Sequence, residues 1–189
     1  MDQTLYNQAI LDVQAGKKEA FGTIYDAFIK PIYNFVYYKT HHKETAEDIT
    51  SLVFTKAFQN IHTYKPDKGP FSAWLYQIAR NQVIDHYRSA HADVDIEDAW
   101  DIGDRTDIDQ DIDTRDQLKK VQAYLGTLSA EQRDIVLLRV WQGLSYAEIA
   151  ATMGKSEASC KMMFSRTISK LKENVPVMLV LGVLLHTWR

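Results

Sequence analysis

The chain has 189 residues, 46% of them hydrophobic, which is enough for one domain or for two small domains with packed cores. Its single cysteine, Cys160, excludes an internal disulfide, and the N-terminus lacks the basic start and apolar run of a secretory signal, so we expect a cytoplasmic protein. The net charge of −3 argues against a DNA-binding protein, but the charge is segregated: residues 1–90 carry +1, residues 91–116 carry −9 and residues 117–189 carry +5.

The pattern of the first 61 residues predicts consecutive helices. Residues 2–15 form the first, which Gly16 ends, and a longer apolar pattern from Phe21 to Val36 forms the next. Pro31 lies inside this pattern, where it should kink the helix or end one helix and start another.

A further helix is predicted over Lys43 to Ile61, and its inner stripe consists of Ala46, Ile49, Val53, Ala57 and Ile61. Leu52, Phe54 and Phe58 do not all fit on that stripe. They indicate either a second buried face within a small bundle or a partner surface.

The segment His62–Pro70 contains two prolines, a glycine and three charges, which predicts an irregular, exposed loop before a helix over Phe71 to Arg88. This helix interleaves aromatic, basic and amide side chains, a pattern that suits single-stranded nucleic acid, whose bases stack on rings. The alternative is an amphipathic helix with aromatics in its core, which we favour for Phe71 and Trp74 individually.

Residues 89–115 show no helical stripe and repeat Asp-Ile four times, which indicates an acidic linker. It is either a solvated spacer or an acidic strand that mimics nucleic acid in a basic channel. Helix is expected to resume over Asp116 to Leu128, and Ser129 with Gln132 forms a capping box for a helix bearing Ile135, Leu138 and Trp141.

The segment from Gly143 to Leu171 predicts a helix-turn-helix. Ser145 and Glu148 form a capping box for its first helix, Gly154 ends that helix, and Ser156 caps the second. The second helix has an inner stripe, and its outer face is small, polar and basic, as suits the major groove. The inner stripe comprises Cys160, Phe164, Ile168 and Leu171, and the outer face Ser159, Lys161, Met162, Ser165, Arg166, Ser169 and Lys172.

The C-terminal tail contains an apolar run from Val175 to Leu185, too short for a membrane span of about 20 residues, so no stable membrane insertion is expected. Pro176 suits the first turn of a helix, and we expect a short helix from Val177 to His186 with one face on the preceding module. The other face would meet a second protein, either an inhibitor or another copy of the chain.

No metal, cofactor or catalytic site is predicted. His41 and His42 have no Cys/His partner at metal-ligand spacing. Asp85 and His86 are the candidate acid/base pair, but adjacent residues on a helix point about 100° apart and do not converge.

Three motifs, in this order, resemble bacterial RNA polymerase sigma factors of the small, extracytoplasmic-function type, over about residues 5–174. AEDITSLVFTKAF (46–58) resembles the family's clamp-docking helix, and FSAWLYQIARNQVIDHYR (71–88) resembles its promoter-melting helix. LSAEQRDIVLLRVWQGLSYAEIAATMG (128–154) with SEASCKMMFSRTISKLKE (156–173) resembles its −35 reading domain. The chain departs from the family pattern at Ser51 and Leu52, where a Gln-Glu pair is usual, and at Met163, where a basic residue is usual.

The resemblance implies an all-α protein that recruits core RNA polymerase to promoter DNA. Residues 1–90 would form the docking and −10 domain, 91–115 the flexible acidic linker, 116–174 the −35 domain and 175–189 an additional tail. The loop from Thr63 to Ser72 would hold a flipped −10 base, and the linker would thread the channel later used by RNA.

The resemblance also assigns residues to three surfaces. The −35 surface comprises Ser159, Lys161, Met162, Ser165, Arg166 and Ser169. The −10 and melting surface comprises Lys65, Asp67, Lys68, Phe71, Trp74, Asn81, Asp85 and Arg88. The surface for the clamp of the polymerase largest subunit comprises Asp48, Ser51, Leu52 and Phe54. An anti-sigma factor is an expected partner, and the competing interpretation is a stand-alone helix-turn-helix regulator that binds duplex DNA without polymerase.

Overall fold

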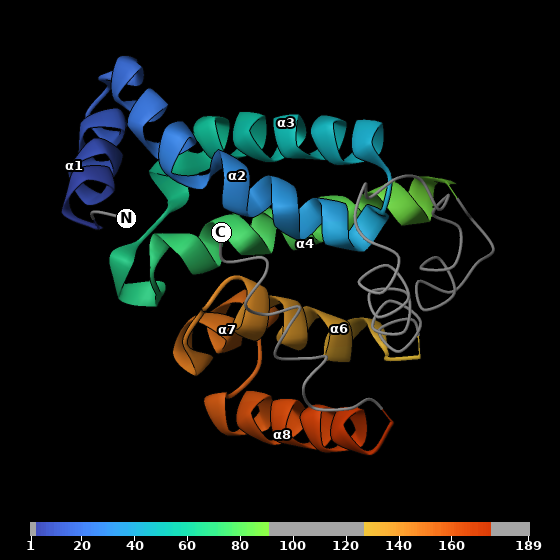
Figure 1. The fold of residues 1–189 in the computed structure, drawn as a ribbon. Helices are drawn as coiled ribbons and strands as arrows, with labels where there is room; N and C mark the ends of the chain where they lie inside the picture. The colour runs from blue at the N-terminus through green and yellow to red at the C-terminus, as the bar shows by residue number, and fades with distance from the viewer. Residues whose placement is uncertain (1–2, 91–126, 175–189) are drawn as a thin grey trace, which may run out of the picture. The chain divides into compact units, whose positions relative to one another are not determined.

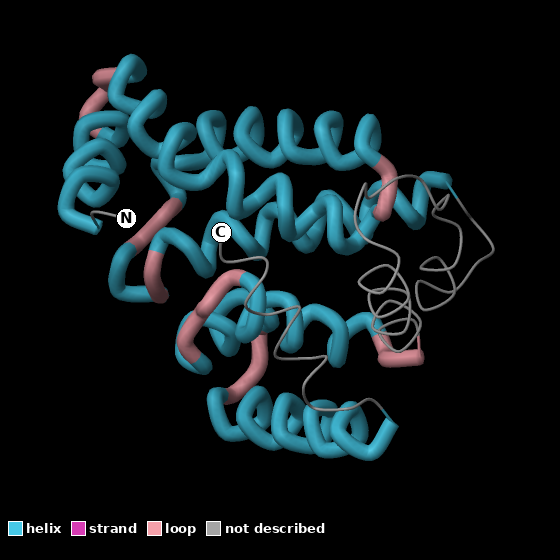
Figure 2. Tube along the Cα trace, in the orientation of Figure 1, coloured by secondary structure: helices cyan, strands magenta, loops and turns pink. Residues whose placement is uncertain are grey.

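The computed structural model describes residues 3–90 and 127–174, and the chain divides into two units, Met1–Asp93 and Val94–Arg189. Within the described residues every regular element is a helix (Figures 1 and 2). The expectations for residues 91–115, most of Asp116 to Leu128, and the tail 175–189 lie outside the described part of the chain. Thr127 and Leu128 form a turn and a bend, so the helix expected there does not extend to them.

The first unit is a bundle of three long helices with a shorter helix at one end (Figure 1). α2 packs on α3 and α4, α3 packs on α4, and α1 packs on α2. In chain order the unit comprises α1 (Gln3–Gln14), η1 (Lys18–Ala20), α2 (Phe21–Thr40), α3 (Lys43–Asn60), η2 (Ile61–Thr63), η3 (Pro66–Lys68) and α4 (Phe71–Ala90).

Helical spacing of apolar residues builds the core of this unit. α2 buries Ile24, Phe28, Ile32, Phe35 and Val36. The inner stripe expected over Lys43 to Ile61 is confirmed, because all five of its members are buried, four of them in α3 and Ile61 at the start of η2. At roughly 1.5–3 kcal/mol for each fully buried large apolar side chain, this interior holds the three helices together.

Of the two outcomes expected at Pro31, a kink or the end of one helix and the start of another, the second is wrong. α2 runs without interruption from Phe21 to Thr40 with Pro31 inside it. Proline removes one backbone donor and crowds the preceding turn. The fully buried Ile32 and Phe35, immediately after Pro31, anchor the helix in the bundle, and tertiary packing overrides the local penalty.

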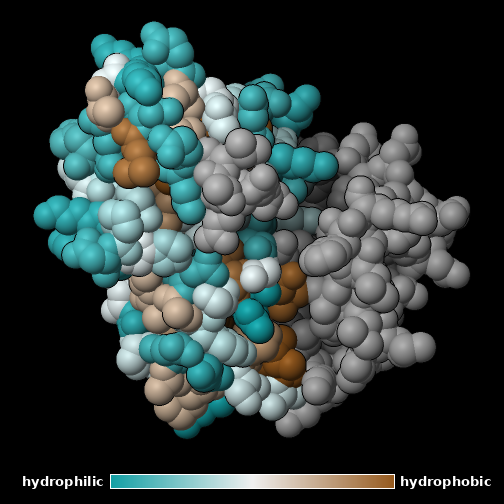
Figure 3. All heavy atoms as spheres, turned by 90° about the vertical axis from the view of Figure 1, so that its left-hand side faces the viewer, coloured by the Kyte–Doolittle hydropathy of each residue, from teal (hydrophilic) through white to brown (hydrophobic). Residues whose placement is uncertain are grey.

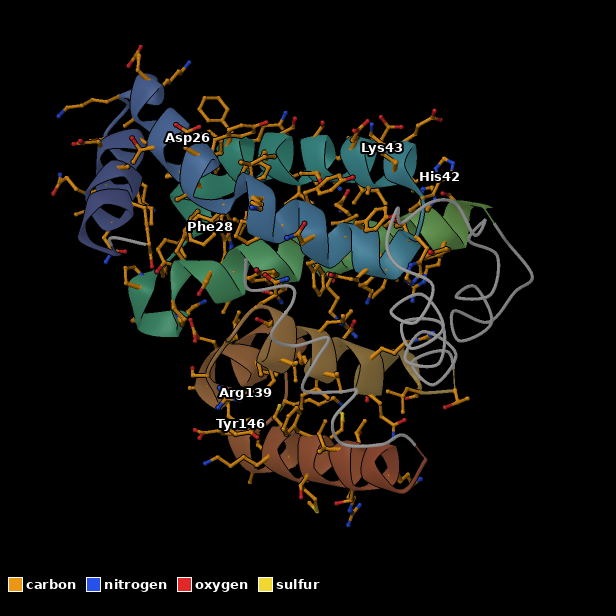
Figure 4. All side chains as sticks on the ribbon, in the orientation of Figure 1. Asp26, Phe28, His42, Lys43, Arg139 and Tyr146 are labelled. Carbon is orange, nitrogen blue, oxygen red and sulfur yellow. The ribbon has the colours of Figure 1, made fainter. Side chains whose placement is uncertain are left out.

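The connection between α2 and α3 is short and strained. His41 lies in the left-handed region at φ 49°, and its N–H donates to the Tyr37 carbonyl at 2.8 Å. His42 is the N-cap of α3, where its Nδ1 accepts the Thr45 N–H at 3.3 Å (Figure 4). The two histidines therefore form the turn between α2 and α3.

The second unit contains the predicted helix-turn-helix. α6 (Ala130–Val136) continues as a π-helical segment, η5 (Leu137–Trp141), and is followed by α7 (Tyr146–Met153) and α8 (Glu157–Asn174). α8 packs on both α6 and α7. The π segment replaces the regular helical end expected there.

The capping signals of this unit are confirmed. Capping boxes are present at Ser129 with Gln132 and at Ser145 with Glu148, and the Ser159 N–H donates to Ser156 Oγ at 3.2 Å. Gly154 ends α7 at φ 66°, a conformation that glycine adopts without a Cβ penalty.

Candidate nucleic-acid interface

The polar face of α4 brings together three of the residues expected at the −10 surface. Asn81, Asp85 and Arg88 are exposed, and Asn81 and Asp85 are one helical turn apart. The Asp85 carboxylate accepts a long hydrogen bond of 3.5 Å from the Gln82 amide. This face therefore offers an amide, a carboxylate and a guanidinium to a ligand.

The aromatic residues at the start of α4 differ from the expectation in one respect. Phe71 is only 2% exposed and Trp74 is half-buried, so Phe71 cannot present its ring to a base. Phe71 packs against Phe28 at 5.7 Å, Tyr64 at 5.1 Å and Trp74 at 5.3 Å between ring centroids. Phe71 therefore supports the loop from the core, in agreement with the alternative that the aromatic residues of this helix are core residues.

The loop between α3 and α4 is more ordered than its composition indicated. It contains two 3-10 turns, η2 and η3, and Tyr64 between them is buried, which corrects the expectation of a wholly exposed, irregular segment. The Tyr64 hydroxyl donates to the Gly69 carbonyl at 3.2 Å, and burial raises its pKa above the usual 10.0. Lys65, Asp67 and Lys68 remain exposed at the tip.

The outer face of α8 exposes most of the residues expected at the −35 surface. Lys161, Met162, Ser165, Arg166 and Ser169 are exposed, and Ser159 is half-buried. On the inner side Cys160 is buried, which raises the pKa of its thiol above 9.0. Phe164 and Ile168 are half-buried, and the buried Thr167, whose hydroxyl donates to the Met163 carbonyl at 2.9 Å, was missed because it is polar.

One cation of this face is already paired. Lys161 Nζ lies 2.8 Å from Glu157 Oε1, one turn earlier on α8, and 5.8 Å from the centre of the Tyr146 ring. Arg166 has no ion pair within the described part of the chain. Of these two side chains, Lys161 is therefore already engaged, whereas Arg166 is available to a ligand.

Arg139 fixes the start of the helix-turn-helix and was not found by sequence reasoning. Its Nη1 donates to the Leu144 carbonyl at 2.7 Å, and its guanidinium lies 4.8 Å from the Tyr146 ring centre (Figure 4). Tyr146 in turn packs against Phe164 of α8 at 6.0 Å. A second tie, Lys155 to Glu131 at 3.0 Å, joins the turn to α6.

The face of α3 expected to dock on polymerase is exposed in part. Asp48 and Ser51 are exposed and Leu52 is 50% exposed, whereas Phe54 is 5% exposed and does not share that face. The Phe54 ring packs against Tyr25 at 4.8 Å. Phe58 and Tyr25 are exposed large hydrophobic residues, and for Phe58 the off-stripe position was the sequence signal.

Residues 3–90 and 127–174 contain no group of three or more His, Cys, Asp or Glu side chains placed to hold a metal ion. In the same ranges no helix is long and apolar enough to cross a membrane.

Comparison with known proteins decides the family. Residues 24–92 match the family model for sigma-70 region 2, and residues 118–171 match that for sigma-70 region 4. The chain is 31% identical over 151 residues to the ECF RNA polymerase sigma factor SigM of Bacillus subtilis, a match that covers 79% of this chain and 91% of SigM. The chain belongs to the ECF RNA polymerase sigma factors.

Further similarities agree with this assignment. The chain is 35% identical over 168 residues to the ECF sigma factor BldN of Streptomyces coelicolor, covering 86% of this chain and 63% of BldN. Its fold is similar to that of the sigma factor RpoE of Bartonella quintana, solved in complex with the anti-sigma factor NepR, with a TM-score of 0.64, 23% identity and coverage of 81% of this chain and 94% of that one.

Membership in the family gives the chain its general role. Sigma factors bind core RNA polymerase and promoter DNA and act in transcription initiation, and the family is not enzymatic. The region 2 match covers α2 from residue 24 onward, α3 and α4, and the region 4 match covers α6, α7 and α8 as far as residue 171.

Proposed function

We propose that this sigma factor reads promoters with two separate surfaces, one on each unit. The −10 surface consists of the α4 face with Asn81, Asp85 and Arg88 and of the loop from Ile61 to Pro70. The −35 surface is the outer face of α8, with Lys161, Ser165 and Arg166. The observation that supports this division is that each unit exposes one helix face carrying amide or hydroxyl groups together with cations.

The functional boundaries that go with this proposal are residues 1–90 for docking and −10 recognition and 116–174 for −35 recognition. Residues 91–115 would connect the two, and their excess of carboxylates would disfavour binding of DNA by the chain alone, since phosphate neutralisation supplies most non-specific affinity. Residues 175–189 would be an addition to this arrangement.

Polymerase docking is assigned to the exposed side of α3. Asp48, Ser51 and Leu52 lie on it, and the exposed rings of Phe58 and Tyr25 extend the apolar area of α3 and α2. An apolar centre with a polar margin is typical of protein–protein interfaces. Phe54 would act from beneath by supporting Tyr25.

An anti-sigma factor is the second proposed partner, because a protein of the same fold, RpoE of Bartonella quintana, was solved bound to one. We also propose that the chain acts in the cytoplasm, where core polymerase and promoter DNA are found.

The test is run-off transcription on genomic DNA fragments, with purified core polymerase, with and without this protein. We expect new, discrete transcripts only when both are present, because each unit alone offers few phosphate contacts. Tight, salt-resistant, sequence-specific binding by the isolated chain, without new transcripts, would instead identify a stand-alone regulator.

Charge reversal on α3 tests polymerase docking, and the same change on α2 is its control. Asp48→Arg should reduce copurification with core polymerase and transcription while helical content stays intact. Asp26→Arg makes the same charge change on α2, at an exposed residue (Figure 4), and should have less effect. Equal copurification of the two variants would count against docking through α3.

A further inference from the structure

The last residue of α1 reaches across the first unit to the loop between α3 and α4. The Gln14 amide donates one hydrogen bond to the Ile61 carbonyl at 2.8 Å and another to the Tyr64 carbonyl at 3.0 Å. A glutamine amide nitrogen carries two hydrogens, so both donors of Gln14 are used. The two carbonyls stand at the first residue of η2 and at its C-cap.

Tyr64 carries this restraint along the loop. Its hydroxyl donates to the Gly69 carbonyl, its ring packs edge-on against Phe71, and it is buried while Lys65 and Lys68 are exposed. Gly69 has φ 136°, a conformation that other residues rarely adopt. The loop is therefore held at its start by Gln14 and closed at its end by Tyr64, with its charged tip free.

A second route joins α1 to the same place. Tyr6 of α1 packs edge-on against Phe28 at 5.1 Å, and Phe28 packs against Phe71, the neighbour of Tyr64 (Figure 4 labels Phe28). α1 precedes the segment that matches the region 2 family model, which begins at residue 24. The end of the first unit that carries α1 presents a largely hydrophilic face (Figure 3). Gln14 is an exposed residue despite its two hydrogen bonds.

We infer that Gln14 is a positioning residue for promoter opening: it holds the loop from Ile61 to Gly69 in the conformation that receives an unpaired −10 base. The inference rests on the proposed function of that loop. A flexible loop must lose conformational entropy when it closes on a ligand, and a loop ordered beforehand binds more tightly. Gln14 acts through the loop backbone and need not touch DNA.

The experiment compares Gln14→Met with Gln8→Met in holoenzyme, on a promoter fragment recovered by the run-off assay. Methionine keeps the length and helix propensity of glutamine but donates no hydrogen bond. Gln8 is an exposed residue of the same helix that bonds only locally, to Asp12 at 3.4 Å, and is the matched control. Permanganate reactivity of unpaired thymines measures opening, footprinting measures the closed complex, and copurification measures polymerase binding.

We expect Gln14→Met to reduce promoter opening about five- to tenfold, because that is the loss that two partly exposed hydrogen bonds can cause. Its closed-complex footprint, polymerase binding and melting temperature should match those of Gln8→Met. Gln14→Lys, whose ammonium can donate to both carbonyls, should restore opening, whereas Gln8→Lys should not raise it.

Two results would overturn the inference. Wild-type opening in Gln14→Met shows that the loop needs no such support, and equal loss of opening, footprint and polymerase binding shows that Gln14 only holds the fold together. Asn81→Ala separates this failure from failure of the proposed function. If Asn81→Ala impairs opening while Gln14→Met does not, only the positioning role is lost; if Asn81→Ala also opens the promoter normally, the assignment of the −10 surface is wrong.

Discussion

The two surfaces proposed to meet DNA differ in how their shape is maintained. The −10 loop depends on partners far away in the sequence, since Gln14 lies 47 and 50 positions before the carbonyls that it binds. The −35 helix combines local and longer contacts: its cap and its ion pair join residues no more than four positions apart. The Tyr146–Phe164 and Lys155–Glu131 contacts join α8 and the turn before it to α7 and α6. One surface is a product of the tertiary structure, and the other is a product of local structure with support from α6 and α7.

Their cations differ as well. Lys65 and Lys68 in the loop have no ion pair within residues 3–90 and 127–174, whereas Lys161 on α8 is paired with Glu157. A paired lysine must break its ion pair before it binds a phosphate. Lys161 should therefore contribute less binding free energy than an unpaired lysine of the loop.

The largest expected effect comes from a pair of variants that separate the two surfaces. Asn81→Ala should lower promoter opening about tenfold, because a lost hydrogen bond to an unpaired base costs roughly 1–3 kcal/mol, and should change closed-complex affinity little. Arg166→Ala should weaken the closed complex about tenfold, the typical cost of losing one base-reading arginine, and should spare opening once DNA is bound. Permanganate reactivity measures promoter opening, and footprinting measures the closed complex. Equal loss of both signals in both variants would show that the two surfaces do not act in separate steps.

A pair of glycine substitutions compares the stability of the two units. Gly154→Ala should destabilise the second unit by about 1–2 kcal/mol, because Gly154 has φ 66° and a Cβ is penalised there. Gly22→Ala, within α2, should stabilise the first unit by about 1 kcal/mol through helix propensity. An added Cβ would meet nothing within 4 Å at either position, so conformation alone decides the sign. Urea denaturation followed by hydrogen exchange in each unit measures both, and shifts of the same sign would contradict this explanation.

The smallest effect concerns the engaged cation. Glu157→Gln should raise affinity for duplex promoter about two- to threefold, because an exposed ion pair is worth roughly 0.2–1 kcal/mol and Lys161 would no longer have to break one. Glu47→Gln removes the looser pair of Lys43 with Glu47 at 3.9 Å on α3 and is the control for net charge. An undiminished gain in the Lys161→Ala background would show that Glu157 acts by repelling phosphate and not by holding Lys161.

Local signals were the ones that sequence reasoning could use. The capping boxes at Ser129 and Ser145 and the left-handed Gly154 were predicted, because each depends on residues within a few positions. Family membership was likewise visible in the order of three motifs. The resemblance assigned Phe54 and Phe71 to surfaces, yet the structure buries both. The helical pattern had already favoured a core position for Phe71, whereas for Phe54 it left a buried face and a partner surface both open.

Long-range structure was beyond that reasoning. Nothing near Pro31 shows that packing on α3 and α4 will keep its helix continuous, and nothing near Gln14 points to a loop 50 residues away. The π segment at Leu137–Trp141 carries no sequence signal that we can name.

The reach of Gln14 also sets an order of events during synthesis of the chain. The carbonyl of Tyr64 is synthesised 50 residues after Gln14. At a synthesis rate of about 5–20 residues per second, roughly 3–10 seconds separate the two. α2 and α3 emerge in that interval and can pair with each other, but the loop stays without its support until both its own residues and α4 have left the ribosome. We therefore expect the loop proposed to act in promoter opening to reach its final conformation after α2 and α3 have packed together.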